Sequence, residues 1–473
     1  MTELIPQWQG WLLVAALGLL SFFVGTRLFR QPGGETKESY LLGNRRVHWV
    51  ATAGSIAATW LAAQALFVVA TRAYTSGWPG VFWFTVPNVL SLIVMGVIAV
   101  RVRRRIPDGV TLSEVIGRST GVSVQRTYQS VLLLGQTLQF AVQLTAGGLL
   151  VSTMTGIQHE TLIVVMGAVI LGYTIRSGVR ATIGTDLMQI LLISVVLGGL
   201  AIWFAVEAGG VVLDGLEGVD GTFTSLISGP GGMLFFSFGL TAGLGLLLGP
   251  FNDQSFWQRT WAGEEKKLRN SFLLAAALFA IAPLTVSLFG FAAAGSGMEI
   301  DPATANLAGM LGWLPSWTVA PFALTVLAAI FSTADSQLSA AASIVGHDMS
   351  RDPRKAVKRG RWGMVILTVL AVAVSLVPGN SVMALFSVFA TVRMVPTGVT
   401  AMSLFSSRVL SERWTLVGLL GGLLGGVPLV AWGTFSGVTW AIFTGTLVAL
   451  LLPTFGAVLG SRAPSEVSEK MSA

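Results

Sequence analysis

Residues 239–259 read GLTAGLGLLLGPFNDQSFWQR, and this stretch decides the fold. Three glycines and a proline, at positions 243, 245, 249 and 250, weaken a helix within an apolar run of membrane-spanning length. Polar residues follow directly, beginning with Asn252, Asp253 and Gln254. Backbone groups freed at membrane depth are tolerated only where they line a cavity or are buried in protein. The stretch therefore predicts a broken helix beside a site, and a simple proline kink is the alternative.

A second interruption lies five spans earlier, where residues 54–69 read GSIAATWLAAQALFVV. Small residues dominate this stretch, and Thr59 and Gln64 fall in its middle. A small-residue face for contact with other helices remains an alternative reading. Corresponding broken helices in two halves of a chain point to an inverted-repeat transporter with its site at the midplane. We therefore expect five-span repeats at 49–208 and 231–410, a leading segment 1–48, an outer loop 209–230 and a trailing segment 411–473.

The composition supports a membrane protein. Of the 473 residues, 53% are hydrophobic and 11% are charged, whereas about 25% of a soluble domain is charged. Apolar runs repeatedly exceed about 18 residues, the length that crosses hydrocarbon as a helix. A soluble enzyme is thereby excluded, and an all-α integral membrane protein of about thirteen transmembrane helices is predicted. The spans are expected near 8–29, 49–73, 78–100, 122–154, 158–175, 181–208, 231–257, 268–294, 314–343, 362–378, 380–404, 414–434 and 437–461.

Basic residues give the orientation. The chain carries a net charge of +7, and its Lys and Arg residues fall in alternate loops, as in the clusters at 101–105 and 351–361. Arg72 and Arg393 are the exceptions. The positive-inside rule then places the N-terminus outside and the C-terminus in the cytoplasm. Such charge contacts membrane lipid rather than nucleic acid, so we expect a multi-pass cell-membrane protein without a nucleic-acid partner and without an obligate protein partner.

Loops and scarce residue types limit the alternatives further. The segment 109–121 is amphipathic and is expected along the inner membrane face, while the outer loops 209–230 and 295–313 are expected to carry short helices. The chain has no cysteine and three histidines, so thiolate sites and histidine metal clusters are not expected. No paired acid and base falls at membrane depth, and an enzyme is therefore not predicted.

Three carboxylates are placed at membrane depth: Asp186, Asp253 and Asp335. Arg393 is expected to be the one buried cation. Ionisable groups in hydrocarbon cost a few kcal/mol each, so they are functional candidates.

From Ala328 onward, the ninth span and the residues that follow it read AAIFSTADSQLSAAASIVGHDMSRD, residues 328–352. Ser332, Asp335, Ser336 and Ser339 share one helical face by their spacing. Oxygen ligands without nitrogen or sulfur suit a hard cation. The alternative is that the hydroxyls bond back to carbonyls of their own helix, which is common in membrane helices.

Five segments together resemble the sodium:solute symporter family, which includes proline, pantothenate, sugar, sialic acid and urea carriers. The resemblance covers about residues 35–410, and its most specific segment is STADSQL at 332–338. The other segments are 40–43 with SIAATWLAA at 55–63, QLTAGGLLVSTMTG at 143–156, GVRATIGTDLMQ at 178–189, and DQSFWQR at 253–259 with Ala262. This resemblance implies the LeuT fold, a 5+5 inverted repeat, and alternating access driven by a sodium gradient.

The resemblance also implies ion ligands. A sodium ion would be held by the carbonyls of three residues and the hydroxyls of two, namely Ala58, Leu61, Ala329, Ser332 and Thr333. A second cation position would fall on Asp186 with Ser332, Asp335 and Ser336. Two carboxylates at one site repel unless a cation or a proton lies between them. The alternative is that Asp335 faces away and is solvated or paired, for example with Arg393.

Solute contacts are expected at the two breaks and on the fourth span. The candidates are amides, aromatic residues and one carboxylate: Gln64, Phe67, Gln139, Gln143, Asn252, Asp253, Gln254, Phe256 and Trp257, with Gln136 nearby. Amide and aromatic side chains favour a small neutral or zwitterionic solute, such as an amino acid, a proline-like compound or a urea-like compound.

The favoured hypothesis is a sodium-coupled symporter that imports such a solute. A proton-coupled carrier on the same fold is the alternative, because Asp186 and Asp335 could carry protons. A membrane sensor built on a transporter-like domain is a third hypothesis, but such proteins usually need a cytosolic signalling domain, and none is expected in this sequence.

Overall fold

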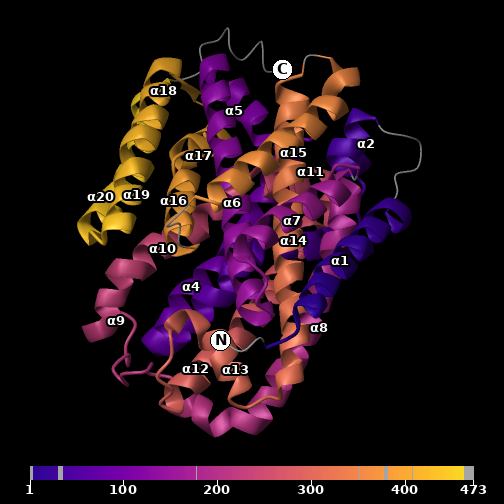
Figure 1. The fold of residues 1–473 in the computed structure, drawn as a ribbon. Helices are drawn as coiled ribbons and strands as arrows, with labels where there is room; N and C mark the ends of the chain where they lie inside the picture. The colour runs from indigo at the N-terminus through magenta and orange to yellow at the C-terminus, as the bar shows by residue number, and fades with distance from the viewer. Residues whose placement is uncertain are drawn as a thin grey trace.

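The computed structural model describes residues 4–29, 36–176, 178–350, 352–377, 382–406 and 408–462. Within these ranges the chain is a bundle of helices (Figure 1). The sheet structure described there is one antiparallel pair of two-residue strands, β1 (Val409–Leu410) and β2 (Ser461–Arg462). The all-α prediction is therefore confirmed.

Helices lie within every predicted span. The helices of these spans are α1 (Gln7–Phe23), α3 (Trp49–Trp60), α4 (Ala63–Arg105), α6 (Val122–Thr155), α7 (His159–Thr174), α8 (Val179–Asp214), α9 (Gly229–Leu234), α10 (Leu240–Leu248), α11 (Gln254–Ala262), α12 (Leu268–Gly295), α14 (Val319–Ser343), α15 (Pro353–Ser375), α16 (Val382–Met394), α17 (Thr397–Phe405), α18 (Glu412–Gly421), α19 (Val427–Ser436) and α20 (Thr439–Leu459). By length and composition, 8 helical stretches of the described chain could cross a membrane. The count of thirteen spans stays a prediction.

The first predicted break separates α3 from α4. Helix α3 ends at Trp60. Leu61 (φ −79°, ψ 76°) leaves the helical conformation, and Ala62 (φ −77°, ψ 150°) is extended before α4 begins at Ala63. The Gln143 side chain on α6 accepts a hydrogen bond of 2.8 Å from the Ala63 backbone N–H. This acceptor satisfies a donor that the interrupted helix leaves free, so α6 stabilises the break.

The second predicted break separates α10 from α11. A 3-10 turn, Gly249–Asn252, follows α10, and Asp253 is extended (φ −123°, ψ 117°) before α11 starts at Gln254. The Asp253 carboxylate accepts a 2.8 Å hydrogen bond from the Ser255 backbone N–H and so caps α11. Both interruptions lie where the sequence analysis predicts them. A simple proline kink does not account for the second, because a 3-10 turn and an extended residue separate the two helices.

The boundary between the second and third predicted spans is a kink rather than a loop. Helix α4 continues through it, with Gly77 in a left-handed conformation (φ 56°). A Cβ at Gly77 would meet the backbone of residues 216–218 at the end of α8. Glycine is therefore required there both for its φ and for the close approach.

Short helices bear out part of the loop predictions. Helix α5 (Leu112–Thr120) lies in the amphipathic segment, and α13 (Ala305–Leu311) lies in the outer loop 295–313. The loop 209–230 differs from expectation, because α8 extends to Asp214 and the described residues 215–228 form turns instead of a separate helix.

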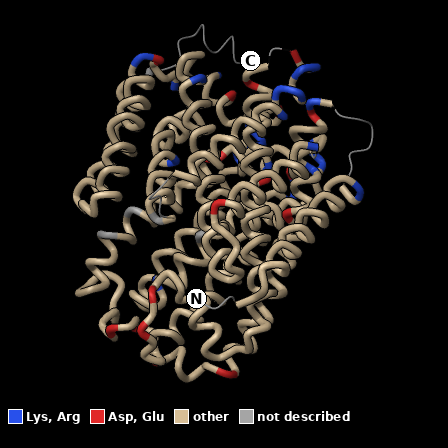
Figure 2. Tube along the Cα trace, viewed as in Figure 1, with Lys and Arg blue, Asp and Glu red and all other residues tan. Residues whose placement is uncertain are grey.

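Helix α14 is the centre of the bundle. It contacts α3, α6, α8 and α15, and every residue from Thr325 to Ser343 is buried. Helices α18–α20 lie along one flank of the bundle and α1 lies along another (Figure 1). Most Lys and Arg residues gather at one end of the molecule, the end at which α5 and α18 lie (Figures 1 and 2).

Candidate ion and solute site

Oxygen atoms from α14 meet the break between α3 and α4. The Ser332 hydroxyl lies 3.1 Å from the Ala58 carbonyl and 3.2 Å from the Ala329 carbonyl. The Thr333 hydroxyl lies 3.4 Å from the Ala58 carbonyl. Four of the five predicted sodium ligands are therefore brought together. The fifth, Leu61, is fully buried within the break itself.

A second cluster, the α8–α14 charge cluster, consists of Asp186, Arg259 and Asp335, all fully buried. The Arg259 guanidinium lies 3.1 Å from the Asp186 carboxylate. The hydroxyls of Ser55 and Ser336 also donate to Asp186, at 2.5 and 3.2 Å. Helices α3, α8, α11 and α14 thus meet around one buried ion pair.

Asp335 belongs to the same cluster through neighbouring residues. Its carboxylate accepts hydrogen bonds from the Tyr173 hydroxyl (2.9 Å) and the Thr185 hydroxyl (3.2 Å). One oxygen of each carboxylate, Oδ1 of Asp186 and Oδ1 of Asp335, is buried without a hydrogen-bond partner among the described residues. Two carboxylates and one guanidinium leave this cluster with one negative charge whenever both carboxylates are ionised.

Arg259 is the main correction to the sequence analysis. Arg393 was expected to be the one buried cation, and the seventh span was expected to end near residue 257, before Arg259. In the structure α11 turns inward after the break and carries Arg259 into the core, where its side chain is fully buried. Two features of the sequence could have indicated that Arg259 is buried. It lies one helical turn after Ser255, and a buried aspartate needs a counter-charge.

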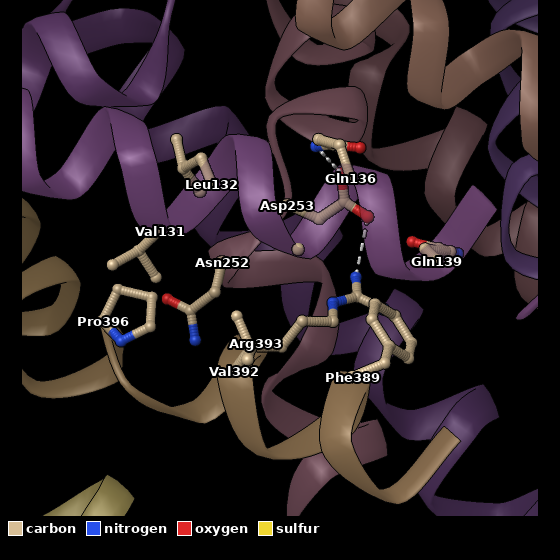
Figure 3. A pocket seen from close by; sticks show the side chains of 11 residues that line it. Val131, Leu132, Gln136, Gln139, Asn252, Asp253, Phe389, Val392, Arg393 and Pro396 are labelled. Atoms are coloured by element: carbon tan, nitrogen blue, oxygen red, sulfur yellow. Dashed lines mark hydrogen bonds and ion pairs between the residues drawn. The ribbon is translucent and has the colours of Figure 1, made fainter. Parts of the chain in front are cut away.

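Arg393 forms the other buried ion pair. Its guanidinium lies 2.8 Å from the Asp253 carboxylate (Figure 3). It also lies 3.0 Å from the Gly249 carbonyl. The alternative in which Asp335 pairs with Arg393 is therefore wrong. The guanidinium also lies over two aromatic rings, 5.2 Å from the centroid of Trp60 and 5.0 Å from that of Phe389. This pair connects the two breaks, because Trp60 ends α3 and Asp253 precedes α11.

The predicted solute residues separate into two groups. Gln139, Asn252 and Asp253 line a small cavity with Arg393 (Figure 3), and Phe256 packs edge-on against Trp60 at 5.4 Å.

The other candidates hold the structure together or lie elsewhere. Gln143 caps α4, Gln254 bonds to the backbone of Val110 and Leu112, and the Trp257 indole donates to the Phe251 carbonyl. Phe67 lines a separate cavity of about 740 Å³. The side chain of Gln64 lies outside the described part of the chain.

The π-helical turn Ile344–Asp348, which follows α14, is bonded to α5 and to Thr111 before it. Asp348 accepts hydrogen bonds from Thr111 (2.6 Å) and Ser113, and His347 lies 3.0 Å from Glu114. Burial raises the pKa of Glu114, but the hydrogen bond and charge of His347, together with Arg118, outweigh burial and hold that pKa below its usual 4.5. The connection therefore depends on an ionised Glu114.

Two interrupted helices around buried polar groups, within a bundle of apolar helices, are typical of multi-pass secondary transporters. The sequence model of the sodium:solute symporter family matches residues 40–426, and the chain belongs to this family. The relatives that the chain matches are named as transporters.

Curated transporters are similar in sequence to this chain. The chain is 24% identical over 312 residues to a probable urea active transporter of Schizosaccharomyces pombe, covering 62% of this chain and 46% of that protein. It is 24% identical over 149 residues to the urea-proton symporter DUR3 of Oryza sativa subsp. japonica, covering 31% of this chain and 20% of that protein. The chain therefore spans less than half the length of these curated relatives.

Solved structures support the fold. A Na⁺-coupled sialic acid symporter in a substrate-bound, outward-open state superposes with a TM-score of 0.77 at 17% identity, over 97% of this chain and 99% of that one. Mhp1, a nucleobase-cation-symport-1 family transporter, superposes with a TM-score of 0.59 at 14% identity, over 92% of this chain and 97% of that one. The predicted LeuT-type fold class is confirmed.

Proposed function

We propose that this chain is a sodium-coupled symporter that imports a small neutral or zwitterionic solute by alternating access. The observation that carries the proposal is the meeting of the Ser332 and Thr333 hydroxyls with the Ala58 carbonyl at the break after α3. Unwound backbone carbonyls beside a discontinuous helix are the usual sodium ligands in transporters of this architecture.

The donor set fits sodium. The proposed ligands are the carbonyls of Ala58, Leu61 and Ala329 and the hydroxyls of Ser332 and Thr333, all neutral oxygens. Hydroxyl rotation turns the oxygen lone pairs toward an ion while the heavy atoms keep their places. A set of neutral oxygens carries no negative charge of its own. It therefore suits a hard cation with a single charge, such as sodium.

Coupling follows from the position of this site between two helices. Sodium would bridge α3 to α14 and favour the arrangement in which the solute cavity beside the breaks is complete. Each ligand then stabilises the shared state, which is all that coupling requires. At about 100 mV, inward movement of one sodium ion releases about 2.3 kcal/mol from the membrane potential.

The proposal also covers the orientation of the chain, its two repeats and the first solute to test. We place the end of the bundle rich in Lys and Arg in the cytoplasm (Figure 2). We treat 49–208 and 231–410 as the two repeats whose relative movement opens each side, with 1–48, the loop 209–230 and the segment 411–473 outside them. Two relatives are named as urea carriers, so urea is the first solute to test.

The test is tryptophan fluorescence of the purified protein titrated with NaCl against KCl at matched ionic strength. We expect a saturable sodium-specific change, because Trp60 ends the helix that carries Ala58. The Ser332→Ala/Thr333→Ala variant should lose this change. Thr325→Ala is the matched control, because Thr325 is a buried α14 hydroxyl bonded to its own helix at 2.7 Å. An unchanged sodium response in the double variant would refute the site.

Proton coupling is the second candidate, and the α8–α14 charge cluster favours it. With both carboxylates ionised the buried cluster carries one uncompensated negative charge, which costs several kcal/mol. A proton or a second sodium on the unpartnered oxygens of Asp186 and Asp335 would remove that cost, with Ser332 and Ser336 close by. Uptake in sodium-free buffer that rises on acidification, and loses this pH dependence in Asp335→Asn, would establish proton coupling in place of sodium coupling.

A further inference from the structure

Arg72 is a basic residue with no part in the ion and solute site. Arg72 and Arg393 are the two Lys and Arg residues outside the alternate loops of the sequence, and Arg393 pairs with Asp253. Within the described chain Arg72 makes no ion pair, and its guanidinium lies over the ring of Phe238, 4.1 Å from the centroid. An aromatic ring offsets part of the cost of a partly buried cation, but it carries no net negative charge. Arg72 therefore lacks a counter-ion.

Arg72 lines the cavity of about 740 Å³ that also includes Phe67, and we call it the Arg72 cavity. Its described lining comes from the first half of α4, from α6, from the first residues of α7 and α16, and from the loop before α13. None of these lining residues is acidic. Glu160 and Asp301 neighbour lining residues in sequence, but both are exposed, so water and salt screen their charge. The positive charge of Arg72 is therefore unbalanced within the cavity.

A hydroxyl in the same cavity also lacks a partner. Thr145 Oγ1 is buried and makes no hydrogen bond within the described chain. Two other threonines of α6 donate to carbonyls of their own helix, Thr137 to Leu133 at 2.8 Å and Thr155 to Val151 at 2.7 Å. Such bonds are the usual arrangement for threonine in a membrane helix. The Thr145 hydroxyl thus remains an unused donor beside the cavity.

These groups specify the charge and size of a ligand. A guanidinium and an unused hydroxyl are both donors, so the matching ligand is an acceptor with negative charge. A monovalent anion balances the single charge of Arg72, whereas a divalent anion would leave an excess charge, which is costly. Since water takes up about 30 Å³ per molecule in the liquid, the cavity has room for a small anion with several waters. A halide and the carboxylate of a small organic acid both fit this description.

The Arg72 cavity lies next to the first helix break. Its lining residue Phe67 comes one helical turn after Ala63, the first residue of α4. Its lining residue Thr145 comes two residues after Gln143, which accepts the 2.8 Å hydrogen bond from the Ala63 N–H. An anion between α4 and α6 would therefore stabilise the arrangement of the two helices that meet at this break.

We propose that the Arg72 cavity is an anion site, in which the Arg72 guanidinium and the Thr145 hydroxyl bind a small monovalent anion. We also propose that the anion and sodium raise each other's affinity, because both stabilise the same arrangement around the first break. This second part rests on the proposed sodium coupling, whereas the anion site itself does not.

The direct test is the line width of the chloride nuclear magnetic resonance in potassium chloride, recorded for the detergent-purified protein against a detergent blank. Chloride that exchanges with a protein site relaxes faster and broadens the averaged resonance. We expect a saturable excess width that Arg72→Gln removes. Lys267→Gln is the matched control, because Lys267 also lies over an aromatic ring, 5.3 Å from the Trp49 centroid, but does not line the cavity. Absence of a saturable excess width, or one that Arg72→Gln leaves unchanged, would overturn the site.

Potassium acetate distinguishes the two kinds of anion. Loss of the saturable excess width on addition of acetate would assign the site to halides and carboxylates alike, and its persistence in excess acetate would assign the site to halides.

A second variant tests the hydroxyl while keeping a β-branched side chain. Thr145→Val should raise the chloride concentration at half-saturation about threefold or more, because the anion loses a donor. Thr137→Val is the matched control, since the Thr137 hydroxyl lies on the same helix but bonds to the Leu133 carbonyl. Equal half-saturation in the two variants would refute the contact with Thr145.

The link to sodium is tested by the fluorescence titration, with sodium replacing potassium in chloride or in sulfate at matched ionic strength. Chloride should lower the sodium concentration at half-saturation about fivefold or more relative to sulfate, and Arg72→Gln should abolish this difference. Equal half-saturation in both salts would overturn the link. Chloride binding that depends on Arg72, without a sodium-specific response, would refute sodium coupling and retain the anion site. A sodium response without saturable chloride binding would retain sodium coupling and overturn the anion site.

Discussion

Removal of Arg259 should destabilise the protein, and additional removal of the charge on Asp186 should restore part of the lost stability. The Arg259 guanidinium is fully buried and donates to Asp186, Ser55 and Ser336 at 3.1, 3.0 and 2.5 Å, and to two further acceptors in α11. The Arg259→Met variant leaves the Asp186 carboxylate in the core without its counter-charge. The flexible methionine side chain fills much of the vacated volume, so the lost charge is the main perturbation.

The expected magnitude follows from the burial of both partners. Removing one partner of a buried ion pair costs about 3–5 kcal/mol, because the remaining charge is uncompensated. Asp186→Asn combined with Arg259→Met removes that charge, so the double variant should regain about 1–3 kcal/mol relative to Arg259→Met alone. The exposed pair of Arg118 with Asp108 provides the contrast, and Arg118→Met should cost about 1 kcal/mol or less.

The assay is the apparent melting temperature of each detergent-purified variant at one heating rate, since unfolding of such proteins is commonly irreversible. Arg259→Met should melt lowest, the double variant should melt above it, and Arg118→Met should stay near the unmodified protein. If the double variant melts at or below Arg259→Met, the buried charge on Asp186 is not what Arg259 compensates, and our account of the cluster is refuted.

Three further predictions concern other parts of the molecule. The pKa of Glu114 is lower in the folded protein than its usual value of 4.5. Ionisation of Glu114 therefore stabilises the fold at pH values above 4.5, and this stabilisation is lost as the pH falls through the pKa of the folded state. Apparent melting temperatures between pH 6 and pH 3.5 should therefore fall less steeply in Glu114→Gln than in the unmodified protein, and parallel curves would contradict a role for the contact with His347. Gln143→Leu should raise the sodium concentration at half-saturation of the fluorescence change, because a buried N–H at the start of α4 loses its acceptor; Gln143→Glu retains an acceptor oxygen and should shift it less. Since the chain has no cysteine, single cysteines can report orientation: in intact cells, a membrane-impermeant maleimide should label Thr222→Cys but not Lys355→Cys, and the reverse pattern would invert the proposed topology.

The all-helical architecture and the two helix breaks could be predicted from sequence alone, for a physical reason. In lipid, backbone groups must bond within their own segment, so long apolar runs become helices and interruptions become visible as glycine, proline and polar residues. The breaks after Trp60 and before Gln254 were found in this way. The same principle identified Asp186, Asp253 and Asp335 as buried, and all three are.

Part of the candidate site was also accessible from sequence. The helical spacing of Ser332 and its neighbours placed their oxygens on one face, and the resemblance to a family supplied the carbonyls across from them. Asn252 and Gln139 were singled out as polar residues in apolar surroundings, and both line the cavity beside Arg393. Gln143, chosen on the same ground, instead caps a helix, because polarity at membrane depth does not distinguish a ligand from a structural partner.

Sequence by itself therefore determined the class of protein, the location of both helix breaks and the burial of the three aspartates. Only the tertiary structure decided which charges pair: Asp186 with Arg259, 73 residues away, and Asp253 with Arg393, 140 residues away. The periodicity of a chain specifies which face of a helix is polar, but the partner of that face depends on how distant helices are placed around it. The Arg393–Asp253 pair exists only once α16 lies against both breaks.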